Sequence, residues 1–96
     1  MSNKHTHPGS ITQQPIVQQT ARVWMSYLSR TNQDRECREL CDIMEKEYNY
    51  NELLEFANRE MTINTGRQIA GVSFNEIDGR RAMASTMVSI LYAIKQ

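Results

Sequence analysis

Apolar residues recur along most of the chain at spacings of three and four, which is the repeat of an amphipathic α-helix. The pattern predicts four helices, over roughly residues 16–30, 34–48, 50–61 and 73–95, and residues 67–72 could add a short fifth helix. No stretch alternates apolar and polar residues as a half-buried strand would, and no segment repeats. The sequence therefore predicts an all-α fold, a compact bundle of four or five helices.

Residues that favour the start of a helix lie at the beginning of several of the predicted helices. Pro15 falls at the first turn of the first helix, where a proline is tolerated best. Asn49 precedes Glu52 by three residues and Ser73 precedes Glu76 by three, the reciprocal arrangement that caps a helix start. These positions support the predicted boundaries.

The last predicted helix is apolar around more of its circumference than one neighbouring helix would cover. Such a helix lies either at the centre of a bundle or in a dimer interface. Met83, Met87, Leu91 and Ile94 are therefore the predicted partner-binding residues. The predicted core residues of the first three helices are Val17, Ala21, Trp24 and Leu28, then Cys37, Leu40, Cys41, Met44 and Tyr48, then Tyr50, Leu53, Leu54, Ala57 and Met61.

The chain divides by composition into a tail and a body. Residues 1–15 are polar and contain both prolines, so we expect a flexible tail, followed by one helical domain over residues 16–96. The longest apolar stretch, residues 82–94, is 13 residues long and is interrupted by Ser85, Thr86 and Ser89. A membrane-spanning helix needs about 20 residues, so we expect a cytoplasmic protein without a membrane partner.

Charge is balanced overall but unevenly placed. Eleven basic and eleven acidic residues cancel, which argues against binding to nucleic acid through bulk charge. The segment from Asp34 to Glu60 holds nine of the acids but only four of the bases. At 96 residues the chain buries a modest share of its surface, which favours self-association.

Few residues suit catalysis or metal binding. Both histidines, His5 and His7, lie in the predicted tail, so the body has no histidine to transfer protons. Cys37 and Cys41 lack the further ligands that zinc requires. We expect them to be small core residues or, alternatively, a redox-responsive thiol pair. The sequence therefore predicts a protein that is not an enzyme and that holds no metal or cofactor.

The stretch QIAGVSFNEI, residues 68–77, combines a glycine, a capping residue and spaced apolar residues. Gly71, Ser73 and Ile77 resemble the turn glycine, the helix cap and the packing residue of helix-turn-helix DNA-binding proteins. The sequence departs from that pattern at Arg67 and Arg80, where the family has a small and an apolar residue.

Two functions follow from these patterns. The first is a small helical protein–protein interaction module, an adaptor, inhibitor or assembly factor that associates with itself or a protein partner through the last helix. The alternative, implied by the helix-turn-helix resemblance, is a DNA-binding regulator that uses residues 67–82, with Asn75, Arg80 and Arg81 contacting the duplex.

Overall fold

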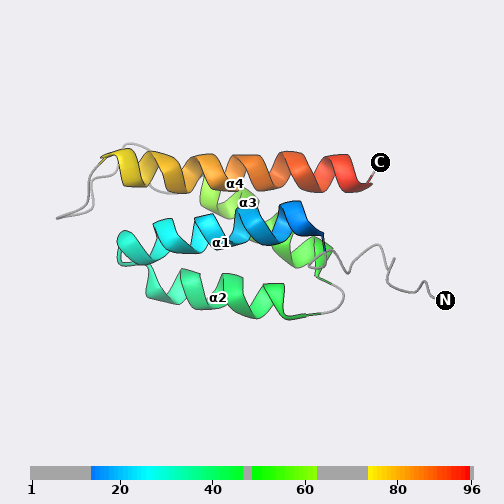
Figure 1. The fold of residues 1–96 in the computed structure, drawn as a ribbon, viewed down its shortest axis with the longest axis horizontal. Coiled ribbons are helices and arrows are strands. Elements are labelled where there is room, and N and C mark those ends of the chain that lie inside the picture. The colour runs from blue at the N-terminus through cyan, green and yellow to red at the C-terminus, as the bar shows by residue number, and fades with distance from the viewer. Residues whose placement is uncertain (1–13, 47–48, 63–73, 96) are drawn as a thin grey trace.

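The computed structural model describes residues 14–46, 49–62 and 74–95 of the chain. They form four α-helices and no strand, which confirms the all-α prediction (Figure 1). The predicted fifth helix at 67–72 and most of the predicted tail lie outside the described residues. The helices are α1 (Pro15–Arg30), α2 (Asp34–Met44), α3 (Tyr50–Thr62) and α4 (Phe74–Lys95).

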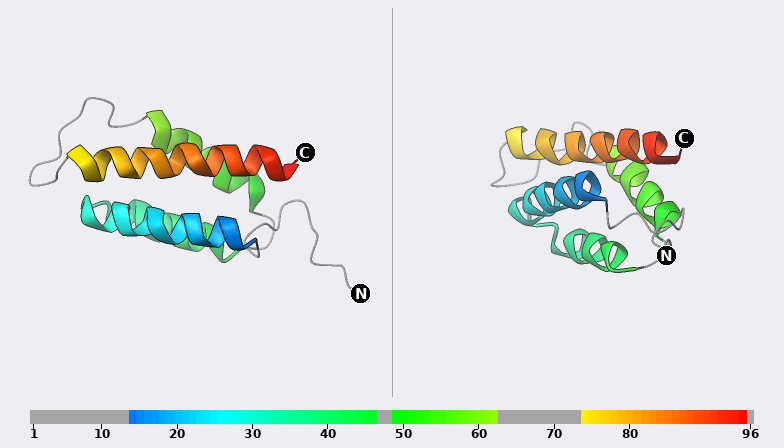
Figure 2. Two further views of the ribbon diagram at one scale, coloured as in Figure 1. Left: turned by 45° about the horizontal axis from the view of Figure 1, so that its top comes forward. Right: turned by 45° about the vertical axis from the view of Figure 1, so that its right-hand side comes forward.

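Successive helices run in opposite directions. α1 packs against both α2 and α4, while α3 packs against α4 and, over fewer residues, against α2. Figure 2 shows α1 and α4 lying side by side along most of their length, with α3 inclined to both. The longest helix, α4, therefore has two neighbours, α1 and α3, and leaves the rest of its circumference uncovered by described helices.

The end of α1 is built by a specific turn. Asn32 adopts φ 60°, the left-handed region. The amide of Asn32 donates to the carbonyl of Ser29, and the amide of Gln33 donates to that of Leu28, which together form a Schellman motif. The buried hydroxyl of Thr31 donates to the carbonyl of Leu28 as well. This turn reverses the chain into α2.

α2 is shorter than predicted. It ends at Met44 rather than near residue 48, and Tyr48 lies outside the described residues. The amides of Glu45 and Lys46 donate three residues back, which tightens the last turn, and the buried side-chain amide of Asn49 donates to the carbonyl of Ile43 at 3.0 Å. The carbonyl of Ile43 thus accepts two hydrogen bonds at the end of α2, one from the Lys46 amide and one from the Asn49 side chain.

The buried face of α3 differs from the predicted one at Phe56, Glu60 and Met61. Phe56 and Glu60 are buried, whereas Met61 is 39% exposed. The ring of Phe56 packs against Trp24 of α1, with their centroids 5.1 Å apart. The core positions Tyr50, Leu53, Ala57 and Glu60 follow steps of three, four and three, and Met61 stands one residue off that series.

Apolar side chains of all four helices make one core. α4 contributes Ala84, Met87 and Leu91 to it, and α4 begins at Phe74, next to the predicted cap Ser73. The core residues are Val17, Ala21, Trp24, Leu28, Leu40, Ile43, Tyr50, Leu53, Phe56, Ala57, Ala84, Met87, Val88 and Leu91. None of the described helices has the length and apolar character that crossing a membrane requires.

Candidate functional site

The four predicted partner-binding residues of α4 do not share one environment. Met87 and Leu91 are fully buried in the bundle core, whereas Met83 and Ile94 are half-buried and pack against that core. The prediction that Met87 and Leu91 contact a partner is therefore corrected, because both side chains already pack against the neighbours of α4 in the bundle. A partner could reach Met83 and Ile94 without opening the fold.

α4 instead presents an outer face, which we define as its six exposed residues between Arg81 and Lys95. The 13 residues between those two bases include no charge at all. A helix at a protein surface normally carries charged residues on its exposed side. Tyr92, 53% exposed, is the one large side chain among small ones. The outer face consists of Ala82, Ser85, Thr86, Ser89, Tyr92 and Ala93.

Beside the outer face, α4 meets α1 along an antiparallel seam whose register is set by two contacts. Nε of Arg30 lies 3.7 Å from Oε2 of Glu76. The ring of Tyr27 covers Gly79 so closely that an added Cβ would lie 2.5 Å from ring Cε1. The absence of a side chain at Gly79 is therefore what lets Tyr27 lie across α4.

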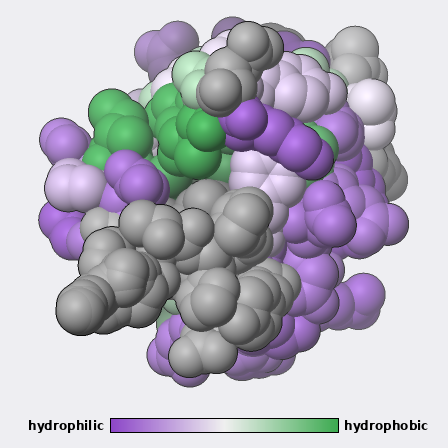
Figure 3. All heavy atoms as spheres, turned by 90° about the vertical axis from the view of Figure 1, so that its right-hand side faces the viewer, coloured by the Kyte–Doolittle hydropathy of each residue, from purple (hydrophilic) through white to green (hydrophobic). Residues whose placement is uncertain are grey.

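The same register continues towards the other end of the seam, because antiparallel helices match each step of three or four residues in one with an equal step in the other. It brings Val23 to the level of Met83 and Ile16 to that of Ile90. Ile16 and Val23 are 51% and 41% exposed, and the two α4 residues are half-buried. Figure 3 views the molecule from the end where α1 begins and α4 finishes, and hydrophobic side chains are exposed there beside mostly hydrophilic surface.

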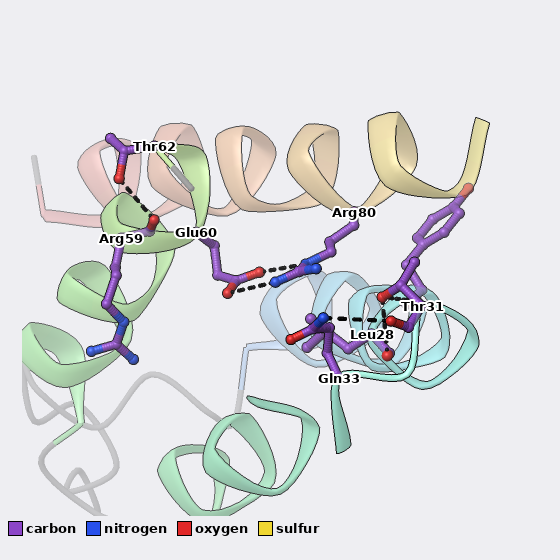
Figure 4. A network of polar contacts seen from close by, with 8 residues as sticks. Leu28, Thr31, Gln33, Arg59, Glu60, Thr62 and Arg80 are labelled. Carbon is purple, nitrogen blue, oxygen red and sulfur yellow. Dashed lines mark hydrogen bonds and ion pairs between the residues drawn. The ribbon is translucent and has the colours of Figure 1, made fainter. Parts of the chain in front are cut away.

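Arg80, one of the three residues predicted to contact DNA, points into the bundle. Its Nε and Nη2 donate to Glu60 of α3 at 2.8 and 3.1 Å, and both side chains are 1% exposed (Figure 4). A buried arginine requires such a partner. The assignment of Arg80 as a DNA contact is therefore corrected: its guanidinium holds α4 to α3.

The other two residues of the DNA-binding alternative remain at or near the surface. Asn75 is exposed, and Arg81 is half-buried with its Nη2 donating to Asp78 at 2.8 Å. Arg67 and the turn itself lie outside the described residues. The helix-turn-helix assignment of residues 67–82 stays a prediction, with one of its three contact residues lost.

A shallow hollow of about 240 Å³ lies between α2 and α3. The buried side chains of Ile43 and Phe56 contribute apolar surface to it. Acidic residues outnumber basic ones around it. Its lining residues are Glu39, Asp42, Ile43, Lys46, Glu52, Glu55, Phe56 and Arg59.

Two ion pairs span this hollow, one between α2 and α3 and the other from Lys46, just beyond α2, to α3. Nζ of Lys46 lies 2.8 Å from Glu52, and Nη2 of Arg59 lies 2.6 Å from Glu39. The hydrogen bond to Glu52 raises the pKa of Lys46, and the hydrogen bond to Glu39 raises that of Arg59. All four side chains are about half exposed, so each pair contributes little to stability. Both basic residues of the lining are thereby engaged with carboxylates.

The two cysteines differ in environment. Cys37 is half-buried against the core, and its thiol lies 3.8 Å from the carbonyl of Met25. Burial raises the pKa of Cys37, and the charges of Cys41 and Asp34 raise it further. The protonated thiol, which is less reactive than the thiolate, is therefore favoured. Cys41 is exposed, which corrects its assignment to the core.

Hydrophobicity in the sequence marks the large apolar side chains and the alanines of the last helix, but not the serines of the outer face. The signal that marks those serines is the missing charge between Arg81 and Lys95. His5 and His7 lie outside the described residues. Within the described part, no three histidine, cysteine or acidic residues are grouped as a metal site would be.

Comparisons with models of known protein families, with curated proteins and with solved structures found no match for this chain.

Proposed function

We propose that the protein is a small, non-enzymatic helical interaction module, an adaptor, inhibitor or assembly factor that binds protein, including its own copies, through α4. The observation that carries this proposal is the outer face, which is exposed along α4 and has no charge. Helices that lack a charged side are normally covered on all sides.

The α1–α4 seam supports the same surface. Ile16 and Val23 expose about half of their side chains beside Met83 and Ile90, so apolar area continues from α4 onto α1. The centre of a non-obligate protein interface is depleted in charged residues. The outer face has no charged residue, and the seam adds apolar area beside it.

A photo-crosslinking experiment tests the proposal in cells. A photoreactive amino acid replaces Ser89 on the outer face and, as a matched control, exposed Ser29 near the end of α1. The Ser89 derivative should give discrete crosslinked polypeptides, whether to itself or to another protein, and the Ser29 derivative should not. Equal labelling from both positions, or none from Ser89, would refute the proposal.

A further inference from the structure

The hollow between α2 and α3 has an unmatched pair of charges near its centre. Asp42 lies three residues after the first paired residue on its side of the hollow and four before the second, and Glu55 has the same spacing on the other side. The two carboxylates therefore lie close to one level, between the two ion pairs. Neither carboxylate has an ion-pair partner among the described residues. Two like charges at one level favour a cationic group between them.

The N-terminal segment, residues 1–13, has the complementary charge. It contains Lys4, His5 and His7 and no acidic residue. The hollow is lined by four acidic and two basic residues, and both basic ones are already bound to carboxylates. Lysine is charged at neutral pH, and histidine becomes charged as the pH falls through about 6.5. The N-terminal segment therefore offers the cationic groups that the hollow lacks.

The N-terminal segment joins α1 at the end of the bundle where α2 finishes and α3 starts (Figure 1). The Cys37 thiol lies 3.8 Å from the carbonyl of Met25, and this contact aligns α2 with antiparallel α1. In this alignment Asp42 lies about 9 Å along the bundle from Gln14, and crossing the width of α2 adds about 10 Å. The chain from Lys4 to Gln14 spans up to about 33 Å when extended. Lys4 thus has the reach to enter the hollow.

We propose that the N-terminal segment binds in the hollow of its own chain, with the ammonium group of Lys4 between the carboxylates of Asp42 and Glu55. Because the tether is short, the effective concentration of the segment at the hollow is in the millimolar range, and a contact with a dissociation constant of about 1 mM is populated to about half. Protonation of His5 and His7 strengthens the contact between about pH 7.5 and 5.5, and salt screens it. The charged groups that face the segment are Glu39, Asp42, Lys46, Glu52, Glu55 and Arg59.

NMR of the purified full chain, with a nitroxide label on the N-terminal segment, tests the contact. The label is attached at Thr6→Cys in a chain with Cys37→Ala and Cys41→Ala. At about pH 5.5 the nitroxide should broaden the backbone amides around the hollow at least about twofold more than the amide of Ser89 on the outer face. The excess should shrink at about pH 7.5 and in about 1 M salt, because the histidines lose their charge or the charges are screened. Broadening spread evenly over the bundle, or none, would overturn the proposal.

Two double variants separate this contact from a general effect of charge. Asp42→Asn with Glu55→Gln removes the unmatched charges and leaves both ion pairs in place, so the excess broadening should disappear. The matched control, Asp34→Asn with Glu45→Gln, changes the net charge equally at two exposed residues outside the hollow and should keep the excess. An equal loss in both double variants would refute binding in the hollow.

A mixture of two chains identifies which copy supplies the segment. Isotope-labelled chain without nitroxide is combined with nitroxide-carrying chain without isotope, and its amides should stay sharp. Broadening around the hollow in this mixture would assign the occupant to a second copy and overturn the proposal. None of these outcomes changes the proposed function, because the hollow lies between α2 and α3 and the outer face lies on α4.

Discussion

Arg80 of α4 and Glu60 of α3 form a two-point ion pair inside the bundle, with N–O distances of 2.8 and 3.1 Å and both side chains 1% exposed. Removing one partner leaves the other charge buried and unpaired, which typically costs about 3–5 kcal/mol. Arg80→Met and Glu60→Leu should therefore each lower the free energy of unfolding by about that amount, measured by urea denaturation.

The double variant should recover most of that loss. Among the described residues Nη1 of Arg80 has no hydrogen-bond partner, so replacing the pair also removes a buried unsatisfied donor. Apolar pairs of similar volume are often as stable as the buried ion pair they replace. Losses that simply add in the double variant would contradict this account of the pair.

Gly79 and Tyr27 make the second testable contact. Alanine normally stabilises a helix by about 1 kcal/mol relative to glycine. A Cβ at position 79, however, would lie 2.5 Å from the Tyr27 ring, so Gly79→Ala should lower stability by about 1 kcal/mol or more. In a Tyr27→Ala background the same substitution should instead raise the melting temperature. A stabilising Gly79→Ala in the parent chain would show that Tyr27 moves aside freely.

The left-handed turn after α1 gives a third prediction. Asn32 has φ 60°, a conformation that costs residues with a plain Cβ roughly 1–2 kcal/mol. Asn32→Ala should lower the free energy of unfolding by about 1 kcal/mol, while Asn32→Gly should preserve it. Asn58, exposed within α3, provides the control, since Asn58→Ala should be neutral or slightly stabilising. Equal effects at positions 32 and 58 would contradict the role of the turn.

The sequence predicted the helices well because their signals are local. Apolar spacing and capping residues lie within a few positions of each other, and the observed starts of α2 and α3 match the predicted ones. The predicted end of α2 was wrong. The observed end is stabilised by Asn49, whose side chain donates back to the carbonyl of Ile43. Such a contact depends on how the chain turns after the helix, which periodicity does not describe.

The candidate site was harder to predict because exposure depends on how the helices pack. Met87 and Ser89 lie two residues apart, and hydrophobicity alone favoured Met87 as the contact residue. The bundle buries Met87 against its neighbours and leaves Ser89 outside. Likewise, neither Arg80 nor Glu60 looks like a core residue until α3 and α4 are placed together, because the two are 20 positions apart.

The buried hydroxyl of Tyr50 links α3 to α4 and gives a prediction in alkaline solution. It donates to the carbonyl of Leu91 at 2.7 Å, and burial, followed by the charge of Tyr92, raises the pKa of Tyr50 above its usual 10.0. The folded protein thus holds this proton more tightly than the unfolded chain does. The resulting stability is fully present below pH 10 and is lost as the pH rises through the folded pKa.

Urea denaturation at a series of pH values from neutral to alkaline checks this dependence. Tyr50→Phe should lower stability at neutral pH by about 1 kcal/mol, because the hydrogen bond to Leu91 is lost, and should remove part of the decline above pH 10. The raised pKa of Cys37 adds a decline that begins near its usual value of 9.0, and Cys37→Ala should remove only that part. A Tyr50→Phe variant whose stability falls above pH 10 as steeply as the parent's would show that Tyr50 is not the group responsible.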